Sequence, residues 1–136
     1  MALGKQWEEE DKLRNIDLFV LLDLLGTNDP PALIYNYFAT DQRSSAAFHL
    51  LHAIEQQWLP TTKADAFLDA EGSLGNMVLE DDHLPFYYRG VPVLHVMPFR
   101  FPRCWHKVCD TQAHLDKTVI SHWMHILWPF MQQSVA

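Results

Sequence analysis

The stretch "IDLFVLLDLLG" at residues 16–26 is an almost uninterrupted run of apolar side chains that ends at a glycine. Such a run, without polar alternation, is typical of a strand buried on both faces inside an α/β sheet. Asp23 interrupts the run near its C-terminal end, where a carboxylate is costly to bury without a partner. Because ligands gather at the carboxyl ends of strands in α/β sheets, Asp23 is a candidate functional residue.

A second run, "VPVLHVMPF" at residues 91–99, is rich in branched apolar residues and predicts another buried strand, with His95 near its end. Apolar side chains recur at helical spacing over residues 44–58 and 115–130, which predicts two amphipathic helices, the second with Asp116 as its N-cap. The positions expected to face the core are Ala47, Phe48, Leu51, Ile54 and Trp58, then Leu115, Val119, Ile120, Trp123, Leu127 and Phe130.

The order strand–helix–strand–helix predicts an α/β fold. Two strands are too few for a self-sufficient sheet with both faces covered, so we interpret them as central strands whose neighbours are absent. The segment 59–76 between them contains the breakers "LPTT" and "EGSLGN" and predicts a polar surface connection.

The composition describes one folded domain: 136 residues, 49% of them hydrophobic and 20% charged. The formal net charge of −7, with the basic residues scattered, argues against binding to nucleic acid or to an anionic membrane. The N-terminus has no apolar segment of signal-peptide length, and the longest apolar run is too short to span a bilayer. We therefore expect neither a signal nor a membrane anchor in this chain.

Titratable side chains cluster around the two expected strands. Asp23 ends the first strand, the run Asp81-Asp82-His83 precedes the second, and His95 and His106 follow. If the strands are neighbours, Asp23 and His95 share an edge, and the loop to His106 leaves from it. A carboxylate and an imidazole there suit a zinc site, with acids as outer partners or bases. No HExxH or paired CxxC motif is present, so spacing alone favours a structural or surface role for His106.

The loop "PRCWHKVCD" at residues 102–110 encloses Trp105 and His106 between Cys104 and Cys109. Two interpretations of the cysteines stay open, two ordinary thiols or a local disulfide. Both are favoured over metal ligation by the cysteines, because a structural zinc site uses four ligands.

Three motifs in close succession carry a resemblance to a known family. They are Asp-Asp-His-x-Pro-Phe from Asp81, Arg-Gly-Val-Pro-Val-Leu-His from Arg89, and Phe-Pro-x-x-Trp-His from Phe101. With "DLFVLLDLLG" and the C-terminal helix, they resemble the C-terminal portion of animal glutaminyl-peptide cyclotransferases (glutaminyl cyclases) from about Ile16 onward. The resemblance implies that residues 1–136 form the C-terminal part of a zinc-exopeptidase-like three-layer fold, a mixed central sheet flanked by helices, whose N-terminal part is missing.

The resemblance also implies an activity, the conversion of N-terminal glutamine, and more slowly glutamate, of peptides into pyroglutamate at a single zinc ion. The zinc would polarise the side-chain amide, and a carboxylate would carry a proton from the attacking amine to the departing ammonia. The residues that match this machinery are His106 as zinc ligand, Trp105 and Phe101 as walls of the substrate pocket, Asp23 and Asp81 as catalytic carboxylates, and His95 in the hydrogen-bond network.

The family's zinc also needs an aspartate and a glutamate, and its general base is a second glutamate, all upstream of the matched region. The run Glu8-Glu9-Glu10 is no substitute, because no strand precedes it. We therefore expect a chain that is inactive alone, derived from a protein of the secretory pathway, either secreted or Golgi-anchored. The alternatives are a non-catalytic short isoform that acts as a binding partner or decoy, and a two-metal aminopeptidase relative, which the Trp-His ending disfavours.

Overall fold

The computed structural model describes residues 12–61, 65–72, 74 and 79–134, and the run Glu8-Glu9-Glu10 lies outside them. Two parallel strand pairs form its sheets. β1 (Phe19–Leu22) pairs with β4 (Val93–Val96), and β2 (Ile34–Tyr35) pairs with β3 (Leu68–Asp69). The two long apolar runs thus form strands, as predicted, and they are neighbours; the prediction of a polar surface connection over 59–76 is wrong at Leu68–Asp69, which form β3.

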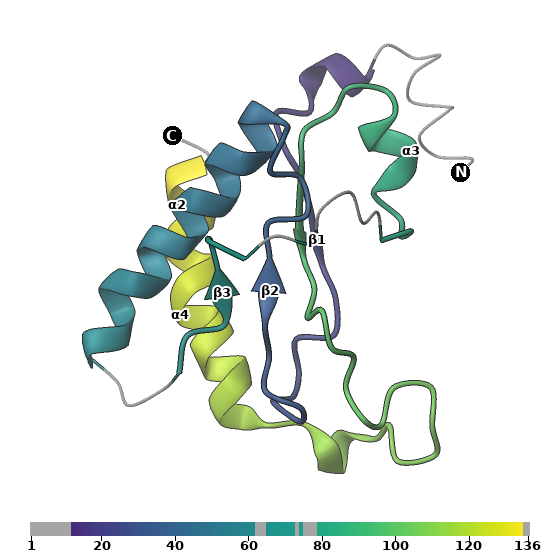
Figure 1. The fold of residues 1–136 in the computed structure, drawn as a ribbon, viewed down its shortest axis with the longest axis vertical. Coiled ribbons are helices and arrows are strands. Elements are labelled where there is room, and N and C mark those ends of the chain that lie inside the picture. Colours follow the sequence, from purple (N-terminus) through teal and green to yellow (C-terminus); the bar gives the residue numbers. More distant parts are fainter. Residues whose placement is uncertain (1–11, 62–64, 73, 75–78, 135–136) are drawn as a thin grey trace.

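Two long helices lie side by side against the strands, and a short helix lies on the other side of β1 and β4 (Figure 1). The long helices are α2 (Gln42–Trp58) and α4 (Lys117–Ser134), and the short one is α3 (Leu84–Tyr87). Single 3-10 turns complete the described elements: η1 (Lys12–Asn15), η2 (Leu59–Thr61) and η3 (Gln112–His114). No described helix combines the length and the hydrophobicity that crossing a bilayer requires.

The two strands of the β1–β4 pair differ in burial. All four residues of β4 are buried, as expected for a strand covered on both faces. In β1, Val20 is 39% exposed and Leu22 is 46% exposed, so the prediction of burial on both faces is wrong for this strand. Helix α2 packs against β4, whereas β1 lies beyond β4 in the same sheet.

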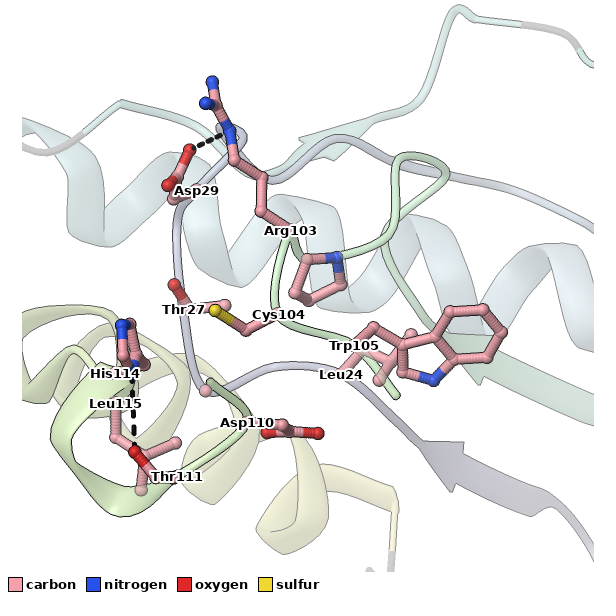
Figure 2. Close-up of a pocket in the computed structure, with 12 residues that line it drawn as sticks. Leu24, Thr27, Asp29, Arg103, Cys104, Trp105, Asp110, Thr111, His114 and Leu115 are labelled. Carbon is pink, nitrogen blue, oxygen red and sulfur yellow. Dashed lines mark hydrogen bonds and ion pairs between the residues drawn. The ribbon is translucent and has the colours of Figure 1, made fainter. Parts of the chain in front are cut away.

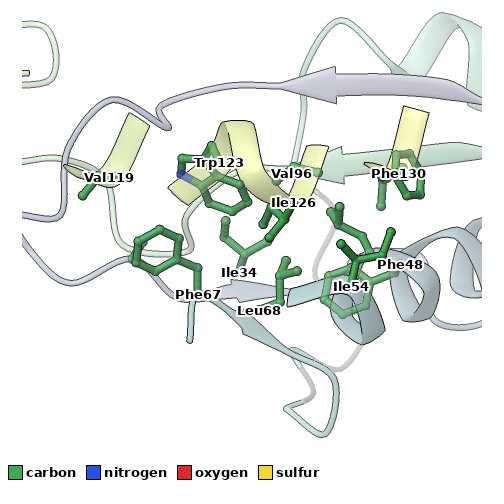
Figure 3. Packing of buried hydrophobic residues seen from close by; sticks show 13 residues of the cluster. Ile34, Phe48, Ile54, Phe67, Leu68, Val96, Val119, Trp123, Ile126 and Phe130 are labelled. Carbon is green, nitrogen blue, oxygen red and sulfur yellow. The ribbon is translucent and has the colours of Figure 1, made fainter. Parts of the chain in front are cut away.

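The hydrophobic core lies between the two long helices and strands β2, β3 and β4 (Figure 3). On α2, Phe48, Leu51 and Ile54 are buried as predicted. The buried residues of α4 are Val119, Trp123, Ile126 and Phe130, whereas Leu115 and Ile120, predicted to face the core, are exposed. Leu115 precedes the helix, and Ile120 lies beside the buried stripe, which follows a spacing of three and four residues.

Both long helices begin at an aspartate. The Asp41 Oδ1 accepts the Ser44 N–H at 2.8 Å, so α2 begins two residues before the predicted Ser44. The Asp116 Oδ1 accepts the N–H groups of Thr118 and Val119 at 2.8 and 3.2 Å, which confirms the predicted N-cap. The Asp116 N–H also donates to the Gly26 carbonyl at 2.8 Å, which ties the chain after β1 to the start of α4.

A buried ionic pair crosses this core. Glu55 on α2 and His122 on α4 are both buried, and the His122 Nε2 donates to the Glu55 Oε1 at 2.9 Å. The same carboxylate accepts the backbone N–H groups of Phe67 at 2.8 Å and Leu68 at 3.1 Å. One glutamate therefore joins both long helices and the start of β3. Sequence reasoning missed this role, because a glutamate in an amphipathic helix usually faces water.

Replacing Glu55 with alanine leaves two backbone N–H groups and one imidazole without their shared acceptor. We expect Glu55→Ala to lower the free energy of unfolding by about 3–5 kcal/mol, measured by urea denaturation. Gln57→Ala, at an exposed position of the same helix, is the matched control and should change it by less than about 0.5 kcal/mol. Equal effects of the two substitutions would contradict a structural role for the buried pair.

Candidate functional site

Asp23 follows directly on β1, at the edge where β4 also ends. Its N–H donates to the Val96 carbonyl at 3.1 Å and so extends the parallel pairing by one residue. Its Oδ1 accepts the Leu24 N–H at 2.9 Å, and Leu24 has a left-handed backbone with φ 59°. A leucine in this region costs about 1–3 kcal/mol, so the sharp turn after Asp23 is held by its surroundings.

His95 lies opposite Leu21 in the β1–β4 register, two residues before the level of Asp23. Its side chain is fully buried, and its Nε2 lies 3.2 Å from the Asp81 Oδ2. The other carboxylate oxygen of Asp81 accepts the Asp82 N–H at 2.8 Å. The Asp81 carboxylate is therefore oriented on one side by its own turn and on the other by the imidazole.

A second histidine, His83, lies beside His95, with 4.5 Å between the ring centroids. Burial, and secondarily the charge of His95, lower the pKa of His83 to about 4. Burial also lowers the pKa of His95, against the opposing attraction of Asp81 and, more weakly, Asp23. The structure therefore brings the predicted residues Asp23, Asp81 and His95 into one electrostatic neighbourhood.

Tyr37 closes this cluster from a position that the sequence did not single out. Its hydroxyl donates to the Met97 carbonyl at 2.7 Å, and its ring centroid lies 5.4 Å from that of His95. Burial raises the pKa of Tyr37 well above its usual value, so the hydroxyl keeps its proton. Only the tertiary structure could reveal this contact, because Tyr37 and His95 are 58 positions apart in the sequence.

The three predicted residues of the following loop also lie together. Phe101 meets Trp105 edge to face, with 4.6 Å between centroids, and Trp105 stacks on His106 at 4.0 Å. All three side chains are exposed, Trp105 by 36%. His106 has a left-handed backbone with φ 56°, which turns the chain at this residue.

Cys104 and Cys109 form a disulfide with their Cα atoms 5.2 Å apart. Of the two interpretations left open by the sequence, the local disulfide is the one that the structure contains. In the loop-entropy model, a cross-link that closes so short a loop stabilises the folded protein by about 2 kcal/mol, because it lowers the entropy of the unfolded chain. It encloses Trp105 and His106.

A cavity of about 250 Å³ lies between this loop and the turn after β1 (Figure 2). Leu24, next to Asp23, lines it on one side, and Cys104 and Trp105 line it on the other. An ion pair between the Arg103 Nε and the Asp29 Oδ1, 2.9 Å long, lies at its rim. The turn after Asp23 and the loop that carries Trp105 therefore line one cavity.

The fit of a zinc ion to these side chains is incomplete. His106 is an exposed imidazole at the edge where zinc is expected, and suits one ligand position. Within the described residues, however, no three side chains of histidine, cysteine, aspartate or glutamate are grouped so that they could hold a metal ion. His106 therefore stays a predicted zinc ligand, and the described residues do not complete a metal site around it.

A model of peptidase family M28 matches residues 3–131 of the chain. The chain belongs to this family. The match confirms the predicted zinc-exopeptidase-like fold, and two solved structures agree with it. The crystal structure of Macrostomum lignano glutaminyl cyclase is similar with a TM-score of 0.75 and 25% identity, over 94% of this chain and 44% of that one. The crystal structure of Acidobacteriales bacterium glutaminyl cyclase is similar with a TM-score of 0.65 and 25% identity, over 97% of this chain and 43% of that one.

Sequence relatives within the family confirm the resemblance to glutaminyl cyclases. A glutaminyl-peptide cyclotransferase of Gloydius blomhoffii is 38% identical over 88% of this chain and 32% of its own length. The glutaminyl-peptide cyclotransferase of Drosophila melanogaster is 32% identical over 84% of this chain and 34% of its own length. An uncharacterized protein of Saccharomyces cerevisiae is 34% identical over 98% of this chain and 41% of its own length. The chain therefore spans less than half the length of each of these relatives.

The histidine pair makes the fold sensitive to acid. His83 has a lower pKa in the folded protein than in the unfolded chain, so the unfolded chain binds more protons below about pH 6.5. We expect the free energy of unfolding to fall as the pH drops from about 6.5 to about 4, by on the order of 1 kcal/mol per pH unit from His83.

Urea denaturation at pH 7 and pH 5 measures this change, and His83→Gln isolates the contribution of the imidazole. The variant should lose less stability than the wild type between the two pH values. His49→Gln, which replaces an exposed histidine on α2, is the matched control and should keep the wild-type response. Identical pH responses of wild type and His83→Gln would contradict the assignment.

Proposed function

We propose that this chain carries part of the active site of a glutaminyl-peptide cyclotransferase, an acyltransferase that converts N-terminal glutamine, or glutamate, of peptides into pyroglutamate. The observation that carries the proposal is that Asp23 and the His95–Asp81 pair lie near the carboxyl end of the β1–β4 pair, and that Leu24, next to Asp23, lines one cavity together with Trp105. The similarity to enzymes of that name supports it.

In the proposed reaction, the α-amino nitrogen of the substrate forms a bond to its own side-chain amide carbon, and the bond from that carbon to the amide nitrogen breaks. Asp23 would orient the substrate and the proton that moves from the amine to the departing ammonia, while the general base would carry that proton. Asp81, held by His95, would fix the orientation of the bound substrate. Phe101 and Trp105 would hold the flat ring, and because closure is intramolecular, positioning supplies much of the acceleration.

His106 is proposed as one ligand of a single zinc ion. The other ligands and the general base would come from outside the described residues, with residues 1–136 as the C-terminal portion of a larger domain. The disulfide supports a further part of the proposal, a location in the secretory pathway, because disulfides persist in oxidising compartments.

An exposed apolar surface favours a second candidate, a non-catalytic protein that acts by binding a partner. Leu22 at the end of β1 and Met124 on α4, 46% and 58% exposed, line one apolar groove together with Ile120. A contiguous apolar surface of this kind marks an interaction site or a risk of aggregation. In this interpretation the chain would act as a binding partner or decoy.

The proposed division of the site predicts that the isolated chain is inactive. Incubation with zinc and a Gln-initiated peptide should give no more pyroglutamate than the peptide gives alone, as measured by mass spectrometry. Zinc titration should show weak binding, since one imidazole is a poor site. Cyclisation by the isolated chain at the rates of full-length cyclotransferases would contradict the prediction.

The coding sequence upstream of Met1 supplies the complementary test. If it continues in frame and encodes an aspartate and a pair of adjacent glutamates, the extended product should form pyroglutamate. In that product Asp23→Asn should lower kcat by about 10²–10⁴, because it removes the carboxylate that orients the substrate and the migrating proton. Asp17→Asn, at an exposed carboxylate just before β1, is the matched control and should leave kcat unchanged.

The solution size of the isolated chain tests the second candidate. A protein that works through its apolar surface should form dimers or larger species in light scattering, and Leu22→Lys with Met124→Lys should shift it toward the monomer. A compact monomer with cooperative unfolding would count against this candidate.

A further inference from the structure

We propose that the Cys104–Cys109 disulfide is a positioning element that holds Trp105 and His106 in the geometry of the site, so that its reduction loosens this wall while the core stays folded. The bond itself and its effect on the loop follow from the described contacts. Its consequence for catalysis rests on the proposed function.

The backbone hydrogen bonds of this loop join it mostly to itself. The N–H groups of Trp105, Lys107 and Asp110 donate to the carbonyls of Pro102, Cys104 and Lys107 at 3.0 Å each, as is usual for consecutive turns. Such bonds shape the turns, but they do not attach the loop to the sheet or to the helices. The loop therefore depends on its two stems for its place in the fold.

One of these stems is attached to the rest of the fold near Asp29. The Arg103 N–H donates to the Asp29 carbonyl at 3.1 Å, and the two side chains form an ion pair. These side chains are 75% and 67% exposed, so water and salt weaken the pair. The disulfide joins this stem to the other one at Cys109, and therefore carries the constraint across the loop.

The tip of the loop needs such a constraint. His106 has a left-handed backbone with φ 56°, which a non-glycine residue adopts only when its surroundings hold it there. Val108, two residues on, is 98% exposed and adds no packing. Beyond the local turns, the cross-link restricts the tip together with the ring contacts of Trp105 with His106 and Phe101.

The disulfide is open to a reductant. Both cysteines are half-buried, and Figure 2 shows the Cys104 sulfur among the side chains that line the cavity beside Trp105. A dithiol attacks one sulfur as a thiolate, passes through a mixed disulfide and leaves as its own cyclic disulfide. Two electrons and two protons are transferred, and the chain gains two thiols.

Hydrogen–deuterium exchange of the full 136-residue chain tests the structural part. In dithiothreitol, or in Cys104→Ser/Cys109→Ser, the amides of residues 105–110 should exchange about tenfold faster or more than in the oxidised chain. The amides of α2 and α4 should keep their rates. Unchanged exchange in the loop, or an equal increase throughout the chain, would overturn the proposal.

Two controls separate the disulfide from its surroundings. The double serine variant has no bond to reduce, so dithiothreitol should leave its exchange unchanged. Asp29→Asn removes the exposed ion pair at the same stem and should raise exchange in the loop by less than about threefold. By NMR, the strong cross-peak between the amide and α protons of His106 that marks a positive φ should weaken on reduction, and its persistence would count against the proposal.

The catalytic part has a separate measurement in a product that cyclises peptides. There Cys104→Ser/Cys109→Ser should lower kcat/KM by about 10- to 100-fold, the size of effect typical of groups that orient a metal ligand. Unchanged kcat/KM alongside a loosened loop would overturn the catalytic consequence. A loosened loop in a protein without cyclase activity in either redox state would keep the positioning role and contradict the proposed function instead.

Discussion

The parallel pairing of β1 with β4 places Leu21 opposite His95, and the candidate site depends on that register. The pairing ends both strands at one edge, where Asp23 continues it through a hydrogen bond to Val96. A shift of one residue would move the side chains of one strand to the opposite face of the sheet. The imidazole of His95 would then leave the Asp81 carboxylate, and Asp23 would lose its place near both. The burial of all four β4 residues resists such a shift, because it would bring the same side chains against the wrong neighbours.

The Glu55–His122 pair supports this arrangement from the opposite side of the sheet. A charged pair in a core is costly to desolvate, and hydrophobic side chains of similar volume often serve stability as well. An apolar replacement would lack directional hydrogen bonds. The Glu55 carboxylate accepts one from the His122 imidazole on α4 and two from successive backbone N–H groups at the start of β3. These bonds fix how α2, α4 and β3 fit together, and α2 in turn packs against β4.

The two halves of the candidate site are held by different means. His95 is fixed by burial on β4, and Asp81, partly exposed before α3, is oriented by its contacts with His95 and the Asp82 N–H. Trp105 and His106 are exposed on a loop and are held by a covalent bond and by local turns. The cavity beside this loop is lined by Trp105 and, across from it, by Leu24, the neighbour of Asp23. The exposed apolar residues of β1 and α4 lie next to that edge, so whatever covers them would also approach Asp23.

The sequence alone determined the α/β class, the two long apolar strands and both long helices, because apolar periodicity is a local property of the chain, and its three linked motifs predicted the residues of the candidate site. It could not determine that β1 is half exposed, because a continuous apolar run looks the same whether one or both faces are covered. Nor could it find Tyr37 or the Glu55–His122 pair, whose partners are distant in sequence. The sequence also left open whether Cys104 and Cys109 are thiols or a disulfide, and the tertiary structure shows the disulfide. Each of these depends on which segments become neighbours in space, and only the packing of the whole chain decides that.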